Sequence, residues 1–505
     1  MRRSPLLDRP GASPNAEGDP DELVPAHYGD PLREQGLLES GAGVTALARD
    51  VVAVTGPDRL SWLTTLSSQA LTGLTPDDGG VETLLLDARG RISHALAALD
   101  DAETLWLVTE AGRGPALVEF LERMRFMLRV EVVVREDVAV LAAMGDGPAR
   151  LEAAAREALG AADAADAADA GAPGPQVDAA DAAGPRGHAA DAAGPRGDAG
   201  APGPRADAGA PDPDASTPGP RQDSRAPSAP SDGPVPLDAT PGAPAAARPG
   251  VWRDPWPGVV EGGTSYDVGL TRPHPGSTYR AGFVLVPVEA VGAVVDAFLA
   301  AAPGRGPAGS LAWEALRIEA GRPRWARDVD ERAIPHELDW LRTAVHLTKG
   351  CYPGQETVAR TLNLGRPPRR LTILQLDGLA GRLPAPGAVV RLGERAVGIV
   401  TSVTRHHDYG PMALALLRRG VPADAALTTD IADAADIADA AEGSERSDAV
   451  EDPEGPAGDD AGSRRGAAAT TRVDAVQELL VSPEGKAQAS PARRPGAGLR
   501  RGLLH

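Results

Sequence analysis

The sequence predicts an α+β protein with two lobes and a small C-terminal β-barrel, interrupted by long disordered insertions. Three observations lead to this class. Short apolar runs with strand periodicity alternate with amphipathic helical patterns in two separate stretches of the 505 residues. After Pro367 the chain continues as short strands and glycine turns without a helical pattern, which is typical of a small barrel. Two tracts rich in Ala, Asp, Gly and Pro interrupt these folded parts.

The first half of the core is predicted within residues 41–147. An alternating strand begins at Val51, and after a Gly-Pro turn a helix begins at Asp58 with its leucines on one stripe. From Val81, the run VETLLLDARGRISHALAALDDAETLWLV is typical of a three-stranded meander. PALVEFLERMRFML then predicts an amphipathic helix, and the residues that follow it predict two more strands.

The second half of the core is predicted within residues 251–365. TYRAGFVLVPV has the pattern of a strand, VEAVGAVVDAFLAAA that of a helix, and SLAWEALRIEAGRP that of a helix which Gly321 ends in left-handed geometry. The barrel is predicted at 366–429, and VDAVQELLVS within 471–483 is expected to return as one more of its strands. Since long structureless stretches usually extend surface loops, the two core halves are expected to pack together.

The remaining segments offer too little apolar surface to offset the entropy cost of ordering them. They are rich in Pro and Gly, and the tract from Gly160 to Gly250 contains no Phe, Trp or Tyr. Four segments are therefore predicted to be wholly or mostly disordered: the tail 1–40, the insertions 148–250 and 430–470, and the tail 484–505.

Composition limits the classes of function. A single cysteine excludes an internal disulfide and cannot by itself supply the thiolates of an iron-sulfur cluster or a structural zinc site, so no metal site is predicted. The net charge of -20 argues against direct nucleic-acid binding. The most apolar long window, from Phe283, contains Pro287, Glu289 and Asp296, so no membrane span is expected. These features predict a cytoplasmic protein.

The single cysteine lies in the run KGCYPGQETVAR, residues 349–360. Gly350 and Gly354 predict a tight loop that leaves the thiol open to another molecule. Lys349 beside it would favour the thiolate through its charge. Cys351 could also be a small hydrophobic side chain that fills a turn, which is the commoner role of a lone cysteine.

KGCYPGQE resembles the K-G-C-[FY]-x-G-Q-E signature of the YgfZ family, folate-binding proteins related to the T-protein of the glycine cleavage system. VTGPDRLSWL, LLLDARGRI and ALRIEAGRPRWARDVDERAIPHELDWL resemble further family segments in the same order, and the resemblance covers roughly 41–147 and 251–421. It implies two interlocked α+β lobes around a central folate channel, followed by a β-barrel. It also implies tetrahydrofolate as the cofactor and, as partners, iron-sulfur assembly or client proteins, including radical enzymes that modify tRNA.

The resemblance also implies the site residues. Cys351 matches the functional cysteine of the family, with Lys349 beside it. Glu319 matches the position that holds the pterin ring, and a carboxylate suits the adjacent N–H donors of a pterin edge. Glu319 could instead pair with Arg317 or Arg322 at a helix end.

Supporting contacts to the cofactor are predicted for Arg317, Gln355, Glu356, Arg360, Asp87 and Arg91. Arg360 could contact the anionic tail of folate or orient the cysteine loop. Gln355 and Glu356 could instead cap the helix that follows, and Asp87 and Arg91 could form a simple salt bridge in the turn.

The predicted function is that of a YgfZ-type folate-binding accessory protein that supports iron-sulfur cluster assembly or maintenance. The alternative is an aminomethyltransferase or folate-dependent demethylase of the T-protein type. T-proteins carry an aspartate pair where GRISHALAAL has His94 and Ala95, so the carboxylate for acid-base catalysis is missing. His94 could substitute for it, or could be a polar turn residue. A third hypothesis is that the low-complexity tracts make the protein a scaffold.

Overall fold

The structure is a computed structural model that describes residues 2–170, 250–431 and 471–492. Most of the two insertions and of the C-terminal tail predicted to be disordered lies outside these described residues.

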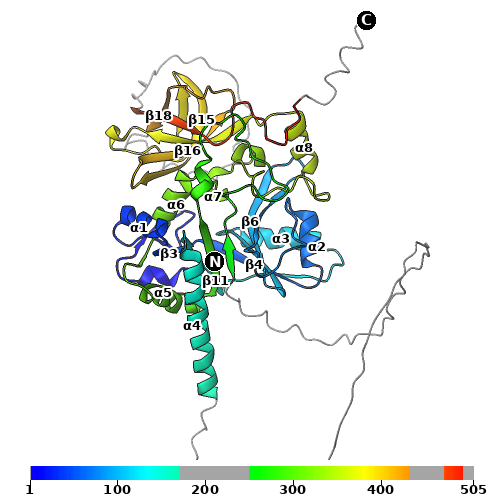
Figure 1. The fold of residues 1–505 in the computed structure, drawn as a ribbon, viewed down its shortest axis with the longest axis vertical. Helices are drawn as coiled ribbons and strands as arrows, with labels where there is room; N and C mark the ends of the chain where they lie inside the picture. The colour runs from blue at the N-terminus through cyan, green and yellow to red at the C-terminus, as the bar shows by residue number, and fades with distance from the viewer. Residues whose placement is uncertain (1, 171–249, 432–470, 493–505) are drawn as a thin grey trace, which may run out of the picture. The chain divides into compact units, whose positions relative to one another are not determined.

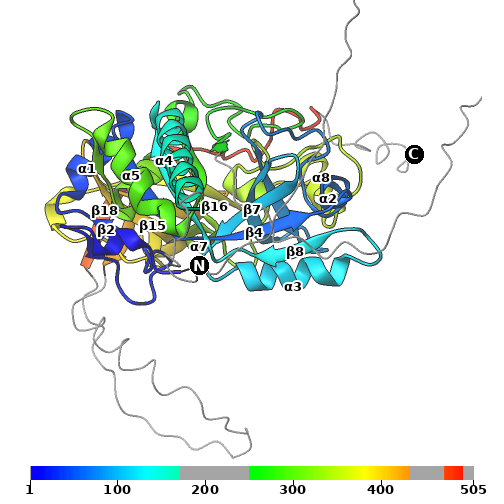
Figure 2. The same ribbon diagram turned by 90° about the horizontal axis from the view of Figure 1, so that it is seen from below.

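Five antiparallel strands form the first sheet, in the order β5 (Val81–Leu86), β6 (Ile92–Asp100), β7 (Thr104–Glu110), β4 (Arg49–Thr55) and β8 (Glu131–Val134). β5, β6 and β7 are the predicted meander. Helices α2 (Arg59–Leu66) and α3 (Gly114–Met124) cover one face, where their leucines pack against alternate strand residues such as Leu96 and Leu105. Figure 2 shows α3 running beside β8 at the edge of this sheet.

The second sheet joins strands from both parts of the chain. Its order is β10 (Val251–Arg253), β11 (Ala281–Pro287), β9 (Val138–Met144), β3 (Gly43–Leu47) and β12 (Gly306–Pro307). β11, which follows the long insertion, pairs along its whole length with β9, which precedes it. Helix α5 (Val291–Ala300) and the first turns of α4 (Gly147–Ala170) pack on this sheet through side chains such as Phe298 and Leu151 (Figure 1). The predicted interlocking of the two lobes is confirmed.

A closed barrel follows, with the strand order β13 (Arg369–Leu376), β16 (Gly410–Arg418), β15 (Arg395–His406), β14 (Val389–Leu392), β17 (Leu427–Ile431) and β18 (Thr471–Leu479). β18 pairs with both β13 and β17 and so closes the barrel. The prediction that the segment after the second insertion returns as a barrel strand is confirmed.

Helix α6 (Ser310–Glu319) links the core to the barrel, because it contacts β3 as well as β15. Gly321, two residues after its end, has a φ of 62°, as predicted for a left-handed C-terminal cap. The other short elements are η2 (Pro275–Thr278), η3 (Val288–Ala290), α7 (Trp325–Asp328), η4 (Pro335–Leu338), α8 (Gln355–Asn363) and η5 (Gly378–Ala380).

The prediction of a mostly disordered tail at 1–40 needs correction. Residues 2–40 form η1 (Pro5–Asp8), β1 (Ser13–Pro14), β2 (Pro25–His27) and α1 (Pro31–Glu39). Asp21 is only 3% exposed because it binds Arg324, and the Asn15 amide donates to the carbonyls of Asp21 and Val24. The order of this segment depends on ion pairs with distant residues, which its Pro-rich and Gly-rich composition does not reveal.

The first insertion also begins later than the predicted residue 148. Helix α4 continues from Gly147 to Ala170, and Leu151, Ala154 and Ala155 on it are buried. Alanine is the strongest helix former, so an Ala-rich run next to the core forms a helix instead of a disordered loop. No helix in the described part of the chain is long and apolar enough to span a bilayer.

Candidate functional site

A cavity of about 110 Å³ is lined by residues of both sheets and of helix α6. Strand β6 contributes Ala95 and Ala97, and the second sheet contributes Trp252 and Phe283. Because strands from both sides of the long insertion form this wall, the cavity exists only when the two parts of the chain are assembled.

Aromatic rings make up much of the cavity wall. Trp252 and Phe283 stack with ring centroids 4.9 Å apart and an angle of 19° between the rings. Trp313, Trp325 and Trp340 line it as well. Flat, apolar walls of this kind suit a planar ring system in a ligand.

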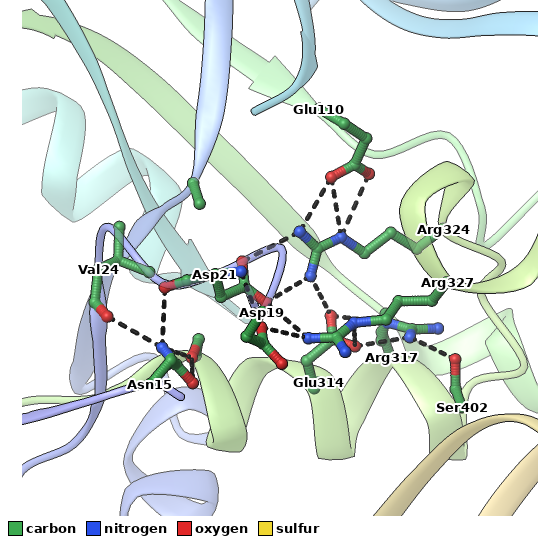
Figure 3. Close-up of polar contacts among 12 residues, drawn as sticks. Asn15, Asp19, Asp21, Val24, Glu110, Glu314, Arg317, Arg324, Arg327 and Ser402 are labelled. Atoms are coloured by element: carbon green, nitrogen blue, oxygen red, sulfur yellow. Dashed lines mark hydrogen bonds and ion pairs between the residues drawn. The ribbon is translucent and has the colours of Figure 1, made fainter. Parts of the chain in front are cut away.

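One side of the cavity is a buried network of ion pairs around Arg324 and Arg317 (Figure 3). The guanidinium of Arg324 donates to Asp21 at 2.6 Å, to Glu110 at 2.9 Å and to Glu314 at 2.9 Å. Burial alone would raise the pKa of Glu314, but Arg317 and Arg324 outweigh it and hold this pKa well below its usual range. Glu314 therefore keeps its charge at neutral pH, and the network ties the amino-terminal segment to α6.

Arg317 is held from several sides. It donates to Glu314 at 2.6 Å, to Asp328 at 2.9 Å and to the hydroxyl of Ser402 at 2.7 Å. Arg317 lines the cavity, as expected of a cofactor contact, but its hydrogen bonds within the protein also make it the link between α6 and the barrel strand β15.

A second buried group of charges lies around Glu82 on the cavity wall. Glu82 accepts hydrogen bonds from Arg322 at 2.6 Å, from Trp340 Nε1 at 3.0 Å and from the Thr343 hydroxyl at 2.6 Å. Arg322 also donates to Asp254 at 3.0 Å, and burial raises the pKa of Asp254. Among the ion pairs described, none joins Glu319 to Arg317 or Arg322, and the partner of Glu319 is His406 at 3.3 Å.

Strand β6 turns His94 away from the cavity. Ala95 and Ala97 pack on the cluster around the cavity, whereas Leu96 and Ala98 belong to the cluster under α2 and α3. Since side chains alternate along a strand, His94 shares the second face. Burial, and to a smaller extent Arg113, lower the pKa of His94 to about 4, so it is neutral near pH 7. His94 therefore cannot replace the missing carboxylate, and Ala95 occupies the cavity face.

The loop with Cys351 is exposed at the surface. Gly354 has a φ of 79° and precedes α8, and a Cβ at this position would lie 2.6 Å from the Asp87 carbonyl. A Cβ on Gly90 would in turn lie 2.9 Å from Thr357 on α8 and 3.4 Å from the Gly354 carbonyl, so the end of the Cys351 loop and α8 pack on the turn between β5 and β6. The exposure of Cys351 excludes the role of a side chain that fills a turn.

Lys349 lies under this loop. Its ammonium group donates to the Thr64 carbonyl and lies 4.6 Å from the centroid of the Tyr352 ring. Burial lowers the pKa of Lys349 to about 8, and the charge of Cys351 partly opposes this shift. Lys349 and Cys351 are therefore close enough to influence each other electrostatically.

Labelling with an amine-specific reagent should show this lowered pKa directly. The rate at Lys349 is expected to rise with a midpoint near pH 8, whereas an ordinary lysine titrates near about 10.4. The sequence has one other lysine, Lys486, so mass spectrometry resolves the two labelled peptides. A midpoint for Lys349 at the ordinary lysine value would contradict the buried setting described above.

The structure brings only part of the predicted site together. Glu319 lies 3.3 Å from His406. It is not among the described residues that line the cavity. Asp87 holds the meander turn by accepting from the backbone of Arg89 and Arg91, and Arg91 donates to the carbonyl of Glu331. Backbone hydrogen bonds therefore hold the turn, and the simple salt bridge between Asp87 and Arg91 is not among the interactions described. A role of either residue in binding stays a prediction.

Two of the predicted contacts on α8, Glu356 and Arg360, are exposed to solvent, and Gln355 is half-buried. Arg360 and Glu356 pair with each other at 2.6 Å, with side chains 67% and 85% exposed. Gly354 is the residue before α8, so Gln355 and Glu356 are the first helical residues rather than caps. Any role of these three side chains in binding stays a prediction.

Sequence reasoning missed Glu82, Asp254 and the aromatic walls. Glu82 gave a usable signal, because VETLLL is a buried apolar strand and a lone carboxylate in it must have partners. Tryptophan positions gave no such signal, since a core tryptophan and one that lines a cavity look alike in sequence.

Comparisons with known proteins add to this geometry. No family model matches the sequence. The chain is 38% identical over 103 residues to a putative chloroplastic transferase of Arabidopsis thaliana, which is 20% of this chain and 23% of that protein. It is 38% identical over 125 residues to the tRNA-modifying protein YgfZ of Edwardsiella ictaluri, which is 24% of this chain and 37% of that one. The matches thus span about a quarter to a third of these relatives.

The fold itself is similar to that of the glycine cleavage system aminomethyltransferase T from Bartonella henselae. That likeness has a TM-score of 0.52 at 18% identity and covers 84% of this chain and 92% of the other. The predicted fold class and the resemblance to the YgfZ and T-protein family are confirmed.

Proposed function

We propose that this YgfZ-like chain with the T-protein fold binds a reduced folate in its central cavity. There it would support iron-sulfur cluster assembly or maintenance in the cytoplasm through Cys351. The observation that carries the proposal is the cavity between the two lobes, with its stacked Trp252 and Phe283 and its buried charges. Planar, partly polar heterocycles such as a pterin suit walls of this composition.

The arrangement around Cys351 supports a role in contact with other proteins. The thiol is exposed, and its loop rests on the turn that leads into the cavity strand β6. A ligand that orders β6 could thus stiffen the support of the cysteine loop. An exposed thiol at this position is suited to meet a cluster, a persulfide or a partner thiol. The similarity to a tRNA-modifying relative supports iron-sulfur enzymes of tRNA modification as clients.

The alternative of aminomethyl transfer is favoured by the likeness in fold to aminomethyltransferase T. Aminomethyl transfer needs an acid-base group near the reacting atoms. Ala95 stands on the cavity face of β6 and His94 on the other face, so this strand supplies no such group. An assay for methylene-tetrahydrofolate formation from an aminomethyl donor decides between the two functions, and turnover would favour the transferase.

Filling the cavity should weaken folate binding. Ala97 lines the cavity and lies opposite Glu82 and Val108 in the sheet. Ala97→Leu adds three carbons to the open space, so calorimetric titration with tetrahydrofolate should show affinity lowered by more than about tenfold, or roughly 1.4 kcal/mol. The thermal midpoint should change little, because the added side chain enters a void.

Ala158→Leu, on the half-buried face of α4, is the matched control and should bind tetrahydrofolate like the wild type. If Ala97→Leu and the wild type bind equally well, the ligand does not occupy this cavity. Glu319→Ala in the same titration tests the predicted pterin contact, and a loss of affinity there would place the folate near His406 instead.

A further inference from the structure

A group of metal-ligating side chains lies outside the cavity, where α1, α6 and the end of β15 meet. The carboxylate of Glu39 and the imidazoles of His406 and His407 each offer a ligand atom, and these atoms all lie within 4.8 Å of one another. The Nε2 atom of His407 lies 3.0 Å from Glu39, and that of His406 lies 3.3 Å from Glu319. Glu39 lies more than 250 positions before the other three residues in the sequence.

The Nε2 atoms of His406 and His407 have no hydrogen-bond partner in the described structure. The side chain of His406 is 1% exposed and that of His407 is 21% exposed, and both Nε2 atoms are buried. Buried polar atoms are nearly always partnered. The Glu39 and Glu319 carboxylates lie within hydrogen-bonding distance of these two Nε2 atoms, but the angles do not suit hydrogen bonds. The two nitrogens therefore lie next to the carboxylates without bonding to them.

We propose that Glu39, His406 and His407 bind a divalent transition-metal ion of the zinc class. Glu319 approaches only His406 of these three residues and is not counted as a ligand. Two imidazoles and one carboxylate are a set that Zn²⁺ accepts. In a tetrahedral site with bonds of about 2.0–2.2 Å, ligand atoms lie roughly 3.3–3.6 Å apart. The separation of 3.0 Å between His407 Nε2 and Glu39 is close to that spacing, and all three ligand atoms lie within 4.8 Å of one another.

The surroundings of the two rings differ. The Nδ1 atom of His407 lies 3.8 Å from the Asp408 carboxylate, which is longer than a hydrogen bond. The Nδ1 atom of His406 accepts from the backbone N–H groups of Asp408 and Tyr409 at 3.2 and 3.3 Å. Neutral His406 therefore carries its proton on Nε2. When a metal ion binds Nε2, the proton moves to Nδ1. The turn then loses the two long hydrogen bonds that Nδ1 accepts from the backbone.

Such an ion would fasten the amino-terminal helix to the barrel. The same turn already docks on α1, because the Gln35 side chain donates to the Arg405 carbonyl at 3.0 Å and accepts from the His407 N–H at 2.9 Å. Metal binding should thus stabilise the assembled chain, since an ion that binds only the folded protein raises its unfolding temperature.

Calorimetric titration of the full chain with Zn²⁺ tests the proposal, in a Cys351→Ser background that removes the thiol as a competing ligand. One equivalent should bind, the thermal midpoint should rise, and Co²⁺ should give the visible absorption of a tetrahedral site. His407→Gln should weaken Zn²⁺ binding by more than about tenfold, because loss of even a group that only supports a metal site costs at least about that much.

Glu39→Gln, at a side chain 43% exposed, repeats the test without removing a buried ring. His27→Gln, at a half-buried histidine of β2, is the control and should bind like the parent. The proposal is overturned if Zn²⁺ fails to bind, or if His407→Gln and Glu39→Gln, both folded by circular dichroism, bind it as tightly as the control.

Discussion

Glu314→Ala is expected to destabilise the folded chain by about 3–5 kcal/mol, the cost of removing one partner from a buried group of charges. Glu314 balances Arg317 and Arg324, which are 2% and 5% exposed. Without this carboxylate two buried guanidinium groups keep fewer acceptors, and the low dielectric of the interior makes each lost partner costly. Urea unfolding should show a lower midpoint with an unchanged slope.

Arg360→Ala is the matched control, because it removes an arginine from a carboxylate pair that is exposed to solvent. Exposed ion pairs contribute about 0–1 kcal/mol to the free energy of unfolding. The urea midpoint of Arg360→Ala should therefore stay near that of the wild type. A loss for Glu314→Ala as small as that of Arg360→Ala would mean that the buried network contributes little to stability.

Cys351→Ala should abolish function in cells while leaving the fold and folate affinity intact. The thiol is exposed and its backbone loop is fixed by Gly354 and the β5–β6 turn, so removing one sulfur atom disturbs no packing. The measurement is recovery of iron-sulfur enzyme activity, such as tRNA modification, in a strain that lacks the protein. Thermal unfolding and tetrahydrofolate titration of the purified variant should match the wild type.

Cys351→Ser should fail like Cys351→Ala, since a hydroxyl has nearly the size of a thiol but cannot act as a thiolate. Thr348→Ala in the same loop is the control and should restore activity. Full activity of both Cys351 variants would end the proposed role of the thiol, whereas loss of folate binding in them would point to a structural role.

The fold could be predicted because strand and helix periodicity are local properties of the sequence. The meander from Val81 and the barrel strand from Val473 both form as their apolar patterns indicate. The order of the amino-terminal segment was missed because it depends on the ion pair between Asp21 and Arg324. No local pattern in a Pro-rich stretch indicates a partner that far along the chain.

The site was predictable only where a motif marks it. Cys351 and its glycines form an exposed loop, as expected. The acid at 319 was assigned from its place in a motif, yet the end of α6 turns it toward His406. Which way a residue faces at a helix end depends on what packs there, and in this chain that partner is a barrel strand almost 90 residues later.

The bond between Asp21 and Arg324, 303 positions apart, has a consequence for biosynthesis. On the ribosome the amino-terminal segment emerges first and must wait for its partner arginine through most of translation, at about 5–20 residues per second. Until then its charged groups remain hydrated and its short strands unsupported. Truncated nascent chains should therefore leave this segment open to proteases, and protection should arise only after Arg324 has left the exit tunnel.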